Sequence, residues 1–201
     1  MGTTNRPYLL AAAVAATLWA AGAAQAAPQA GAWQTWWGQV TQAQGVFTLA
    51  SRVPVSPGET HSALVTSRRT WGDQTFSYTL TTLAQLRTGS TPNTWEVGWS
   101  MFRFRDLHHY YWFILRPNGW ELGKKQGSDT QIFLATGTAP SLVAGQTNRI
   151  RINVQGARVQ VSVDGTTVVD YTDAHPLAPG SVALYEEDSL VRFESVSVVG
   201  A

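Results

Sequence analysis

The 201-residue sequence contains no cysteine, which excludes disulfide bonds, thiol catalysis and zinc sites with cysteine ligands. Charged residues are also scarce, at 13% of the chain, and they are scattered along it. Binding to nucleic acid requires a basic stripe for the phosphates, and anionic membranes attract clusters of Lys and Arg. We therefore expect neither nucleic acid nor a membrane surface as a partner of the mature chain.

The longest apolar run of the sequence lies near its start. Arg6 precedes an apolar stretch over residues 9–24, and Ala24-Gln25-Ala26 has the small-x-small pattern that a signal peptidase cleaves. The run is shorter than the about 20 apolar residues that a membrane span needs. We predict a signal peptide over residues 1–26 and a secreted, extracellular protein, periplasmic or at the cell surface if the host is bacterial. An uncleaved membrane anchor is the alternative.

The remaining chain is long enough for one domain with a sizeable core. Its 13 basic residues balance 13 acidic ones, because Arg6 is the one charged residue in the predicted signal. We predict a partly irregular N-terminal segment over 27–44, in which Trp33, Trp36 and Trp37 cover one end of the core, and a single domain over 45–201. We expect a monomer. An exported domain of this size that contains no cysteine favours a bacterial source.

Short runs of β-branched and aromatic residues, separated by Gly, Pro, Asn and Asp, follow one another from residue 45 on. Asp164-Gly165 between two Val-rich runs predicts a two-residue hairpin turn with positive φ at both positions. Helical periodicity is absent after residue 27, so the pattern predicts an all-β sandwich or barrel. The expected strands are 46–52, 62–67, 75–87, 94–105, 108–115, 120–124, 131–136, 149–155, 158–163, 166–171, 182–185 and 191–198.

Three segments carry a resemblance to a known superfamily. The stretches NRIRINVQGARVQVSVDGTTVVDYTD (148–173) and GSVALYEEDSLVRFESVSV (180–198) resemble the closing half of concanavalin A-like domains, in particular laminin-G-like and 3-keto-disaccharide hydrolase-like ones. The block QLRTGSTPNTWEVGWSMFRFRDLHHYYWFILRPNGWELGKKQ (85–126) resembles secreted bacterial members, which are also similar to sandwich-fold polysaccharide lyases. The resemblance implies a single antiparallel jelly-roll β-sandwich. It does not choose an activity, because this fold carries lectins, hydrolases, lyases and inert modules.

The block from Trp95 to Trp120 combines aromatic and ionisable residues on neighbouring strands. Alternation places Trp95, Trp99 and Arg103 on one face of the first strand, and His109 with Tyr111 on one face of the next. Sugar rings stack on aromatic faces while Arg, Glu and His bind hydroxyl groups. We therefore predict binding of a polysaccharide or oligosaccharide. The candidate ligand-binding residues are Arg87, Glu96, Trp95, Trp99, Arg103, Arg105, His109, Tyr111 and Trp120.

A polysaccharide lyase acting on uronates is one alternative. Such an enzyme needs a cation for the uronate carboxylate, a base for the C5 proton and an acid for the leaving oxygen. Arg103, His109 and Tyr111 have suitable side chains for these three roles, and Arg87, His108 and Tyr110 are the neighbouring choices. A structural or adhesion module is another alternative, in which the same rings are ordinary core residues.

A retaining glycosidase of the laminarinase type is disfavoured. Those enzymes carry a Glu-x-Asp-x-Glu or Glu-x-Asp-x-x-Glu motif on one strand, and Glu186 and Asp188 supply its first two positions. Positions 190 and 191 are Leu and Val, so the third carboxylate is missing. If the chain is an enzyme, we expect a lyase before a glycosidase.

The resemblance also implies one structural Ca²⁺, for which Glu194 in the last strand matches the carboxylate ligand of related sandwiches. Ca²⁺ requires six to eight oxygen ligands, so Glu194 needs several others. The four histidines show no zinc-ligand spacing. We expect no other cofactor.

Overall fold

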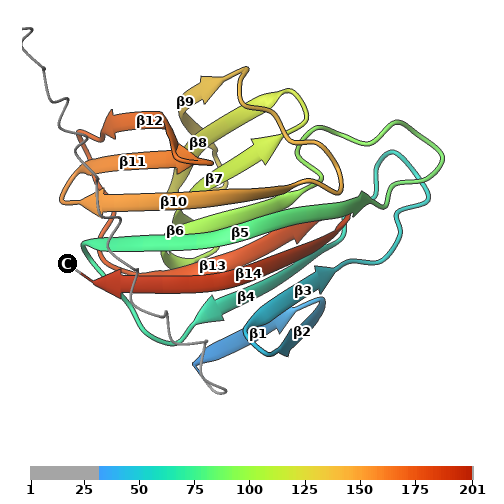
Figure 1. The fold of residues 1–201 in the computed structure, drawn as a ribbon, viewed down its shortest axis with the longest axis horizontal. Helices are drawn as coiled ribbons and strands as arrows, with labels where there is room; N and C mark the ends of the chain where they lie inside the picture. Colours follow the sequence, from blue (N-terminus) through green and yellow to red (C-terminus); the bar gives the residue numbers. More distant parts are fainter. Residues whose placement is uncertain (1–31, 201) are drawn as a thin grey trace, which may run out of the picture.

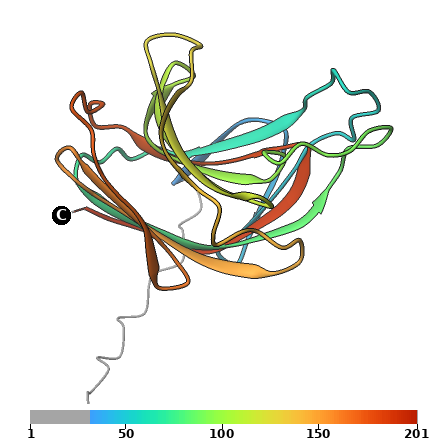
Figure 2. The ribbon, with the colours of Figure 1, turned by 90° about the horizontal axis from the view of Figure 1, so that it is seen from above.

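Two antiparallel sheets of seven strands each pack face to face in the computed structural model, which describes residues 32–200 (Figures 1 and 2). These residues contain no helix, and thus none that could cross a membrane. The predicted signal peptide lies outside the described residues. The predicted all-β sandwich is confirmed.

Strands from distant parts of the chain alternate within each sheet. In spatial order, sheet A consists of β1 (Trp33–Trp37), β4 (Ser62–Ser67), β13 (Ser181–Glu187), β6 (Gly98–Asp106), β7 (His109–Arg116), β8 (Gly119–Gln126) and β9 (Ile132–Gly137). Sheet B consists of β12 (Thr166–Thr172), β11 (Arg158–Val163), β10 (Thr147–Gln155), β5 (Gln74–Gln85), β14 (Ser189–Gly200), β3 (Val46–Ala50) and β2 (Gln39–Ala43). Strands β13 and β6 to β9 of sheet A contribute residues to the site described below.

The core lies between the inner faces of the two sheets. Along β10, every second side chain is buried, which gives Ile150, Ile152 and Val154 to the core and leaves Arg149 and Arg151 outside. This period-2 alternation is what a strand with one solvated face requires. Burial of each such aliphatic side chain contributes about 1.5–3 kcal/mol. From sheet A, the inner-face residues include Phe102, Phe113, Leu115, Leu122 and Leu184.

The turn between β11 and β12 has the predicted geometry. Asp164 has a φ of 51° and Gly165 a φ of 84°, as a two-residue turn with positive φ at both positions requires. The Asp164 carboxylate also accepts hydrogen bonds from Asn148 Nδ2 at 2.9 Å and from the Arg149 backbone N at 2.7 Å. The turn is thereby tied to the neighbouring strand β10.

Residues 33–43 form two strands within the segment that was predicted to be partly irregular. β1 pairs with β4 in sheet A, and β2 pairs with β3 in sheet B. Gly38 alone connects them, with a φ of 80°, and a Cβ there would lie 2.3 Å from that of Ala63. Trp33 packs edge-on against Phe47 of the core at 4.9 Å. The sandwich therefore includes strands that precede the boundary predicted at residue 45.

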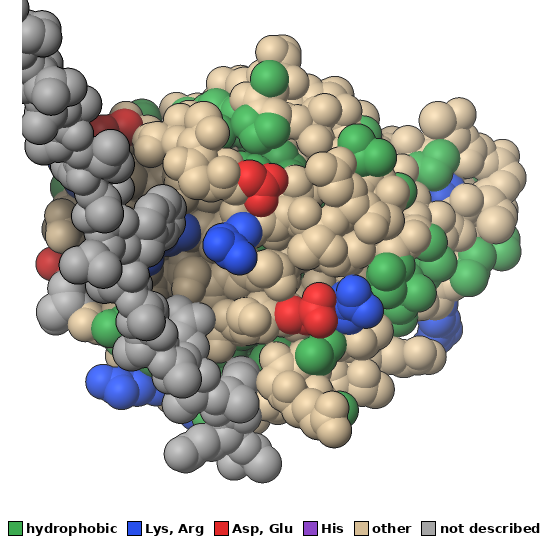
Figure 3. Space-filling view, viewed as in Figure 1, with side chains coloured by type: hydrophobic (Ala, Val, Ile, Leu, Met, Phe, Trp, Pro, Cys, Tyr) green, Lys and Arg blue, Asp and Glu red, His purple; other side chains and the backbone are tan. Residues whose placement is uncertain are grey.

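The outer faces of the two sheets differ in chemistry. Where Figure 3 shows the outer side of sheet B, few side chains are charged, and an acidic one lies directly beside a basic one, as in the ion pair of Arg192 with Glu194. Sheet A instead carries large side chains on its outer face as well as its inner one. A Cβ on Gly98 would contact Leu80 and Phe193 of sheet B, so Gly98 faces inward and Trp99 faces outward. Met101 lies two residues after Trp99 on β6, so it faces outward as well. Trp112 on β7 is the cross-strand partner of Met101 and therefore also faces outward.

The indole of Trp112 fits on the sheet because the neighbouring strand carries a glycine beside it. Its cross-strand partner on β8 is Gly123, where a Cβ would lie 2.1 Å from Trp112 Cζ2. The indole of Trp112 therefore lies flat over β8, in edge contact with Phe133 at 6.0 Å and beside Tyr110 at 6.1 Å. This packing buries Trp112 completely and makes the outer face of sheet A an aromatic floor.

Candidate functional site

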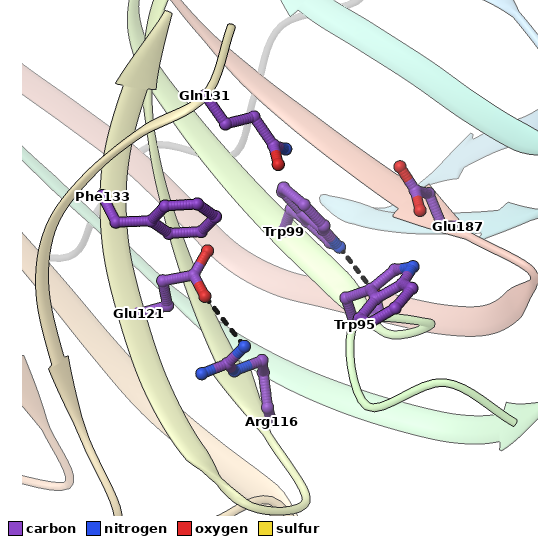
Figure 4. A pocket seen from close by; sticks show the side chains of 7 residues that line it. All are labelled: Trp95, Trp99, Arg116, Glu121, Gln131, Phe133 and Glu187. Carbon is purple, nitrogen blue, oxygen red and sulfur yellow. Dashed lines mark hydrogen bonds and ion pairs between the residues drawn. The ribbon is translucent and has the colours of Figure 1, made fainter.

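A cavity of about 260 Å³ opens on the outer face of sheet A (Figure 4). A second cavity, also about 260 Å³, lies beside it and has Tyr110, Lys125 and Tyr185 in its wall. The two cavities share Trp99, Gln131 and Glu187, so we treat them as one groove. The first cavity is lined by Trp95, Trp99, Arg116, Glu121, Gln131, Phe133 and Glu187.

Two exposed rings flank the first cavity. Trp95 is 44% exposed and Phe133 is 58% exposed, whereas Trp99 between them is 5% exposed and forms the floor. Trp99 Nε1 donates a hydrogen bond of 2.8 Å to the Trp95 backbone oxygen, which fixes the turn that carries Trp95. Trp99 also packs edge-on against Tyr185, with ring centroids 5.7 Å apart. The groove therefore offers apolar ring surface at fixed positions.

An ion pair lies at the β7–β8 end of the cavity. Arg116 Nη1 is 2.8 Å from Glu121 Oε2, and Glu121 Oε1 accepts a hydrogen bond of 2.9 Å from Trp112 Nε1. Arg116 Nε is buried and has no hydrogen-bond partner within the described residues. Buried donors are nearly always satisfied in native proteins, so this N–H is a candidate to bind a ligand oxygen.

Glu187 lies on the other side of Trp99, near the end of β13 (Figure 4). Its Oε1 accepts a hydrogen bond of 2.7 Å from the Tyr185 hydroxyl. Burial raises the pKa of Glu187, and the nearby carboxyl groups of Asp188 and Glu96 raise it further, against the lowering effects of Tyr185 and Lys125. The groove thus contains a carboxyl group that takes up a proton more readily than a solvated glutamate.

A buried ion network lies behind the groove and supports the side that carries Trp95 and Glu187. Arg87 Nε is 2.6 Å from Glu96 Oε1, and Arg87 Nη2 is 2.7 Å from Asp188 Oδ2, with all three side chains at most 1% exposed. Glu96 adjoins Trp95 in sequence, and Asp188 adjoins Glu187. Arg87 and Glu96, predicted as ligand-binding residues, therefore point away from the groove and fix the backbone of residues that line it.

Arg103 does not share an open face with Trp99 as predicted. It has a φ of 47°, and the pairing of β6 with β7 shifts register between Phe102 and Asp106. This β-bulge turns Arg103 inward, where its guanidinium donates hydrogen bonds to the backbone oxygens of Leu177 at 2.8 Å and Gly156 at 2.7 Å. Arg103 therefore anchors two loops at the far end of the sandwich.

Tyr111 and His109 are also outside the groove. Tyr111 faces inward and donates a hydrogen bond of 2.5 Å to Asp173, which Lys124 Nζ contacts at 2.7 Å. His109 bonds Asp106 at 2.9 Å at the tip of the β6–β7 hairpin. Arg103 and Tyr111 lie close to each other, because Arg103 donates to the Leu177 backbone oxygen at 2.8 Å and Tyr111 accepts from the Leu177 backbone N at 3.1 Å. His109 is apart from them, and none of the three residues predicted for a lyase lines the groove.

The two remaining predicted ligand residues differ in exposure. Trp120 is buried and donates from Nε1 to the Ala139 oxygen at 2.9 Å, so it faces the core and a loop. Arg105 is exposed beyond the bulge of β6. Of the predicted ligand residues, Trp95 and Trp99 line the groove.

Sequence reasoning missed the polar residues of the groove. Glu186 and Asp188, which match a glucanase motif, both point inward: Glu186 Oε2 accepts a hydrogen bond from Ser189 N, and Asp188 pairs with Arg87. Strand alternation then places Glu187 outward, and this signal was available from the sequence. The other missed lining residues are Arg116, Glu121, Gln131 and Phe133.

The surroundings of Glu194 do not fit the expected Ca²⁺. Glu194 Oε2 lies 3.2 Å from Arg192 Nε on the solvent side of sheet B. The Arg192 guanidinium therefore already neutralises the carboxylate that was expected to bind Ca²⁺. Between residues 32 and 200, no group of three or more His, Cys, Asp or Glu side chains is arranged to hold a metal.

Solved structures of several carbohydrate-related proteins share this fold. The carbohydrate-binding module CBM66 from Bacillus subtilis is 16% identical, with a TM-score of 0.66 over 83% of this chain and 94% of that one. The β-glucanase of Bacillus licheniformis is 12% identical, with a TM-score of 0.60 over 87% and 94%. A Bacillus subtilis protein with a galectin-like fold is 14% identical, with a TM-score of 0.59 over 83% and 88%. These likenesses confirm the predicted jelly-roll architecture.

Sequence comparison identifies the family. No curated protein matches the chain. The family model described as a 3-keto-alpha-glucoside-1,2-lyase-like domain matches residues 23–199, which include every described strand, with β14 covered as far as Val199. This match agrees with the resemblance to 3-keto-disaccharide hydrolase-like domains. The chain therefore belongs to the family of 3-keto-alpha-glucoside-1,2-lyase-like domains.

Proposed function

We propose that this chain is an exported carbohydrate-binding protein that holds a neutral polysaccharide or oligosaccharide in the groove on sheet A. One observation carries the proposal: exposed rings of Trp95 and Phe133 flank polar groups of Arg116, Glu121 and Glu187 in one cavity. The export rests on the predicted signal peptide. The fold shared with a module named for carbohydrate binding is in keeping with this function.

The groove has the two kinds of contact that sugar rings use. The apolar C–H face of a sugar stacks on an aromatic ring, here Trp95 or Phe133, and the hydroxyl groups need donors and acceptors. Arg116 Nε is an unpaired donor, and Glu187 and Gln131 can accept or donate. A sugar in the cavity would therefore satisfy a buried N–H that has no partner in the described chain.

The charges of the groove favour a neutral glycan over a uronate. Its two long cationic side chains are each paired with a carboxylate: Arg116 with Glu121 at 2.8 Å, and Lys125 with Asp129 at 3.2 Å. Glu187 adds a further acidic group, and no cation within residues 32–200 is in hydrogen-bond contact with it. A uronate carboxylate would meet repulsion and no free cation, which disfavours the lyase alternative.

A glycan array tests the proposal with the secreted mature chain. The array holds neutral glucans, xylans, mannans, galactans and fructans beside the uronate polymers alginate and pectate. We expect binding to a neutral glycan and at least a fivefold loss of affinity for Trp95→Ala, since losing one ring contact costs about 1 kcal/mol. Trp36→Ala is the matched control, because Trp36 is 43% exposed but lines neither cavity.

Each other outcome rejects the proposal. Binding to no glycan would favour a structural or adhesion module. Binding to alginate or pectate with release of unsaturated products would favour the lyase. Equal losses for Trp95→Ala and Trp36→Ala would place the ligand outside the groove.

A further inference from the structure

A third cavity, of about 510 Å³, lies at the corner where the chain passes from sheet A to sheet B. Figure 1 shows β1, β2 and β3 together at this edge of the sandwich. Residues 37–39 form one wall of this corner cavity, Ser51 and Arg52 after β3 form a second, and His61 with Ser62 at the start of β4 forms a third. Of the described residues, Trp37 alone lines both the corner cavity and the groove.

Hydrogen bonds fix two walls of the corner cavity. Trp37 Nε1 donates to Ser62 Oγ at 2.9 Å, which holds the indole against β4. The backbone N of His61 donates to Asp188 Oδ1 at 2.7 Å, and the backbone N of Asp188 donates to the His61 oxygen at 2.9 Å. These walls are therefore in place before a ligand enters, which lowers the entropy cost of binding.

Two buried polar atoms of the corner cavity have no hydrogen-bond partner within residues 32–200. They are Ser51 Oγ and His61 Nδ1. The latter lies 3.8 Å from Asp188 Oδ1, which is too far for a hydrogen bond. Native proteins satisfy nearly all buried polar atoms, with protein groups, water or ligands. Two unpaired atoms in the walls of one cavity therefore mark a place where a polar molecule can bind.

The corner cavity also carries a free positive charge. Arg52 is exposed, and its guanidinium has no ion pair or hydrogen bond in the described part of the chain. Among the described residues, no carboxylate lines this cavity. The Asp188 carboxylate behind His61 is buried and already accepts a hydrogen bond of 2.7 Å from Arg87. An arginine without a carboxylate beside it is suited to bind the oxygens of an anion.

The size of the corner cavity favours an organic anion over an inorganic one. Its volume of about 510 Å³ lies within the range of small-molecule sites, about 300–1,000 Å³, and leaves room beside an anionic group. The half-buried indole of Trp37 gives one wall an apolar surface, on which the C–H face of a sugar ring can pack. The lining thus combines one ring, one free cation and hydroxyl donors.

We propose that the corner cavity is a second binding site, which takes a sugar that carries a carboxylate, phosphate or sulfate group. Arg52 pairs with the anionic oxygens, and the Ser51 hydroxyl donates a hydrogen bond to one of them. The sugar ring packs against Trp37, and His61 Nδ1 contacts one of its hydroxyl groups. The corner site differs from the groove in charge, because Arg116 and Lys125 of the groove each have a carboxylate partner.

Calorimetric titration of the secreted mature chain tests the corner site with D-galacturonate, glucose 6-phosphate, glucose 6-sulfate and glucose. We expect at least one charged sugar to bind at least about tenfold more tightly than glucose, which lacks the group that pairs with Arg52. The tightest of the three identifies the anionic group. Acetate, inorganic phosphate and inorganic sulfate, which make no contact with Trp37, should bind more weakly than the sugar with the same group.

Substitutions in the lining locate the bound sugar. Arg52→Gln should weaken the binding of the charged sugar at least about tenfold, and Ser51→Ala about threefold or more. Both variants should fold, because neither side chain loses a hydrogen bond that the described chain provides. Arg105→Gln is the matched control and should keep the affinity, because Arg105 is an exposed arginine on β6 that lines neither the corner cavity nor the groove.

The corner site and the groove fail separately in this design. No binding, or equal affinities for glucose and the three charged sugars, would overturn the corner site. Equal losses for Arg52→Gln and Arg105→Gln, or an inorganic anion that binds as tightly as its sugar, would also overturn it. Trp95→Ala should leave the charged sugar bound, and a loss of affinity there would assign that sugar to the groove instead. Binding that requires Arg52 supports the corner site whether or not a neutral glycan binds in the groove.

Discussion

Tyr185 and Glu187, two residues apart on β13, are joined by a hydrogen bond of 2.7 Å on the outer face of sheet A. The hydroxyl is the donor, so this bond favours the ionised form of Glu187 and opposes the effect of burial on its pKa. The groove therefore contains a device that limits how strongly Glu187 holds its proton.

Replacement of Tyr185 by Phe should raise the pKa of Glu187 further. The variant loses the hydrogen bond to the carboxylate but keeps the ring that packs against Trp99. NMR titration of the Glu187 side-chain carboxyl carbon measures the shift. Tyr171→Phe, on β12 of the other sheet, is the control and should leave the titration unchanged. A lower or equal pKa in Tyr185→Phe contradicts the role assigned to the hydroxyl.

Arg87 should be essential for stability. Arg87→Met leaves Glu96 and Asp188 buried without their cation, and loss of one partner of a buried ion pair costs about 3–5 kcal/mol. Urea unfolding measures this loss of the free energy of unfolding. The matched control is Arg158→Met, which removes an exposed ion pair with Asp170 and should change stability little. Similar losses of the free energy of unfolding in the two variants would show that burial does not determine how much an ion pair contributes to stability.

Glu186 should make the protein less stable as the pH rises. Burial raises its pKa from 4.5 to about 8, with further contributions from Asp188 and Glu187. Between these two values the folded chain holds a proton that the unfolded chain has released, so the free energy of unfolding falls with increasing pH.

The variant Glu186→Gln removes this titration. Relative to the wild type, it should gain stability steadily from pH 5 to pH 8 in urea unfolding measurements. The sign follows because ionisation of Glu186 stabilises the unfolded wild-type chain as the pH rises, and the variant has no such ionisation. A stability difference that stays constant over this range would mean that Glu186 titrates normally in the folded state.

The hairpin between β11 and β12 should depend on glycine. Gly165 has a φ of 84°, and an L-residue in the left-handed region costs about 1–2 kcal/mol. Gly165→Ala should lower the free energy of unfolding by about that amount. Gly58→Ala is the control, because no atom lies within 4 Å of its Cβ position and its φ is not in that region. Equal stabilities of the two variants would contradict the turn assignment.

Local pattern was sufficient to predict most of the fold. The bounds of β4 and β11 match the predicted strands 62–67 and 158–163, because alternation and turn residues mark both ends of each. Asp164-Gly165 forms a tight turn whose φ values follow from the two residue types. These features depend on residues that are neighbours in the sequence, so they can be predicted from the sequence alone.

The site was harder to predict because it depends on which face of sheet A is covered. Both faces of β7 carry large apolar residues, so alternation separates Tyr111 from Trp112 but does not say which one meets sheet B. The bulge at Arg103 reverses the alternation at a residue type that rarely has positive φ. Glu121 and Phe133 reach the cavity through pairing of β8 and β9, which no local signal specifies.

The passage of the chain through Gly38 has a consequence for solubility. The five residues on each side of this glycine lie along β4 in one layer and along β3 in the other. Without them, both strands would present rows of unpaired amide and carbonyl groups, which are templates for strand addition by a second molecule. In the intact fold β1 and β2 form these edges, so proteolytic trimming of this short stretch should transfer the open edges to the more apolar strands β4 and β3 and favour association edge to edge.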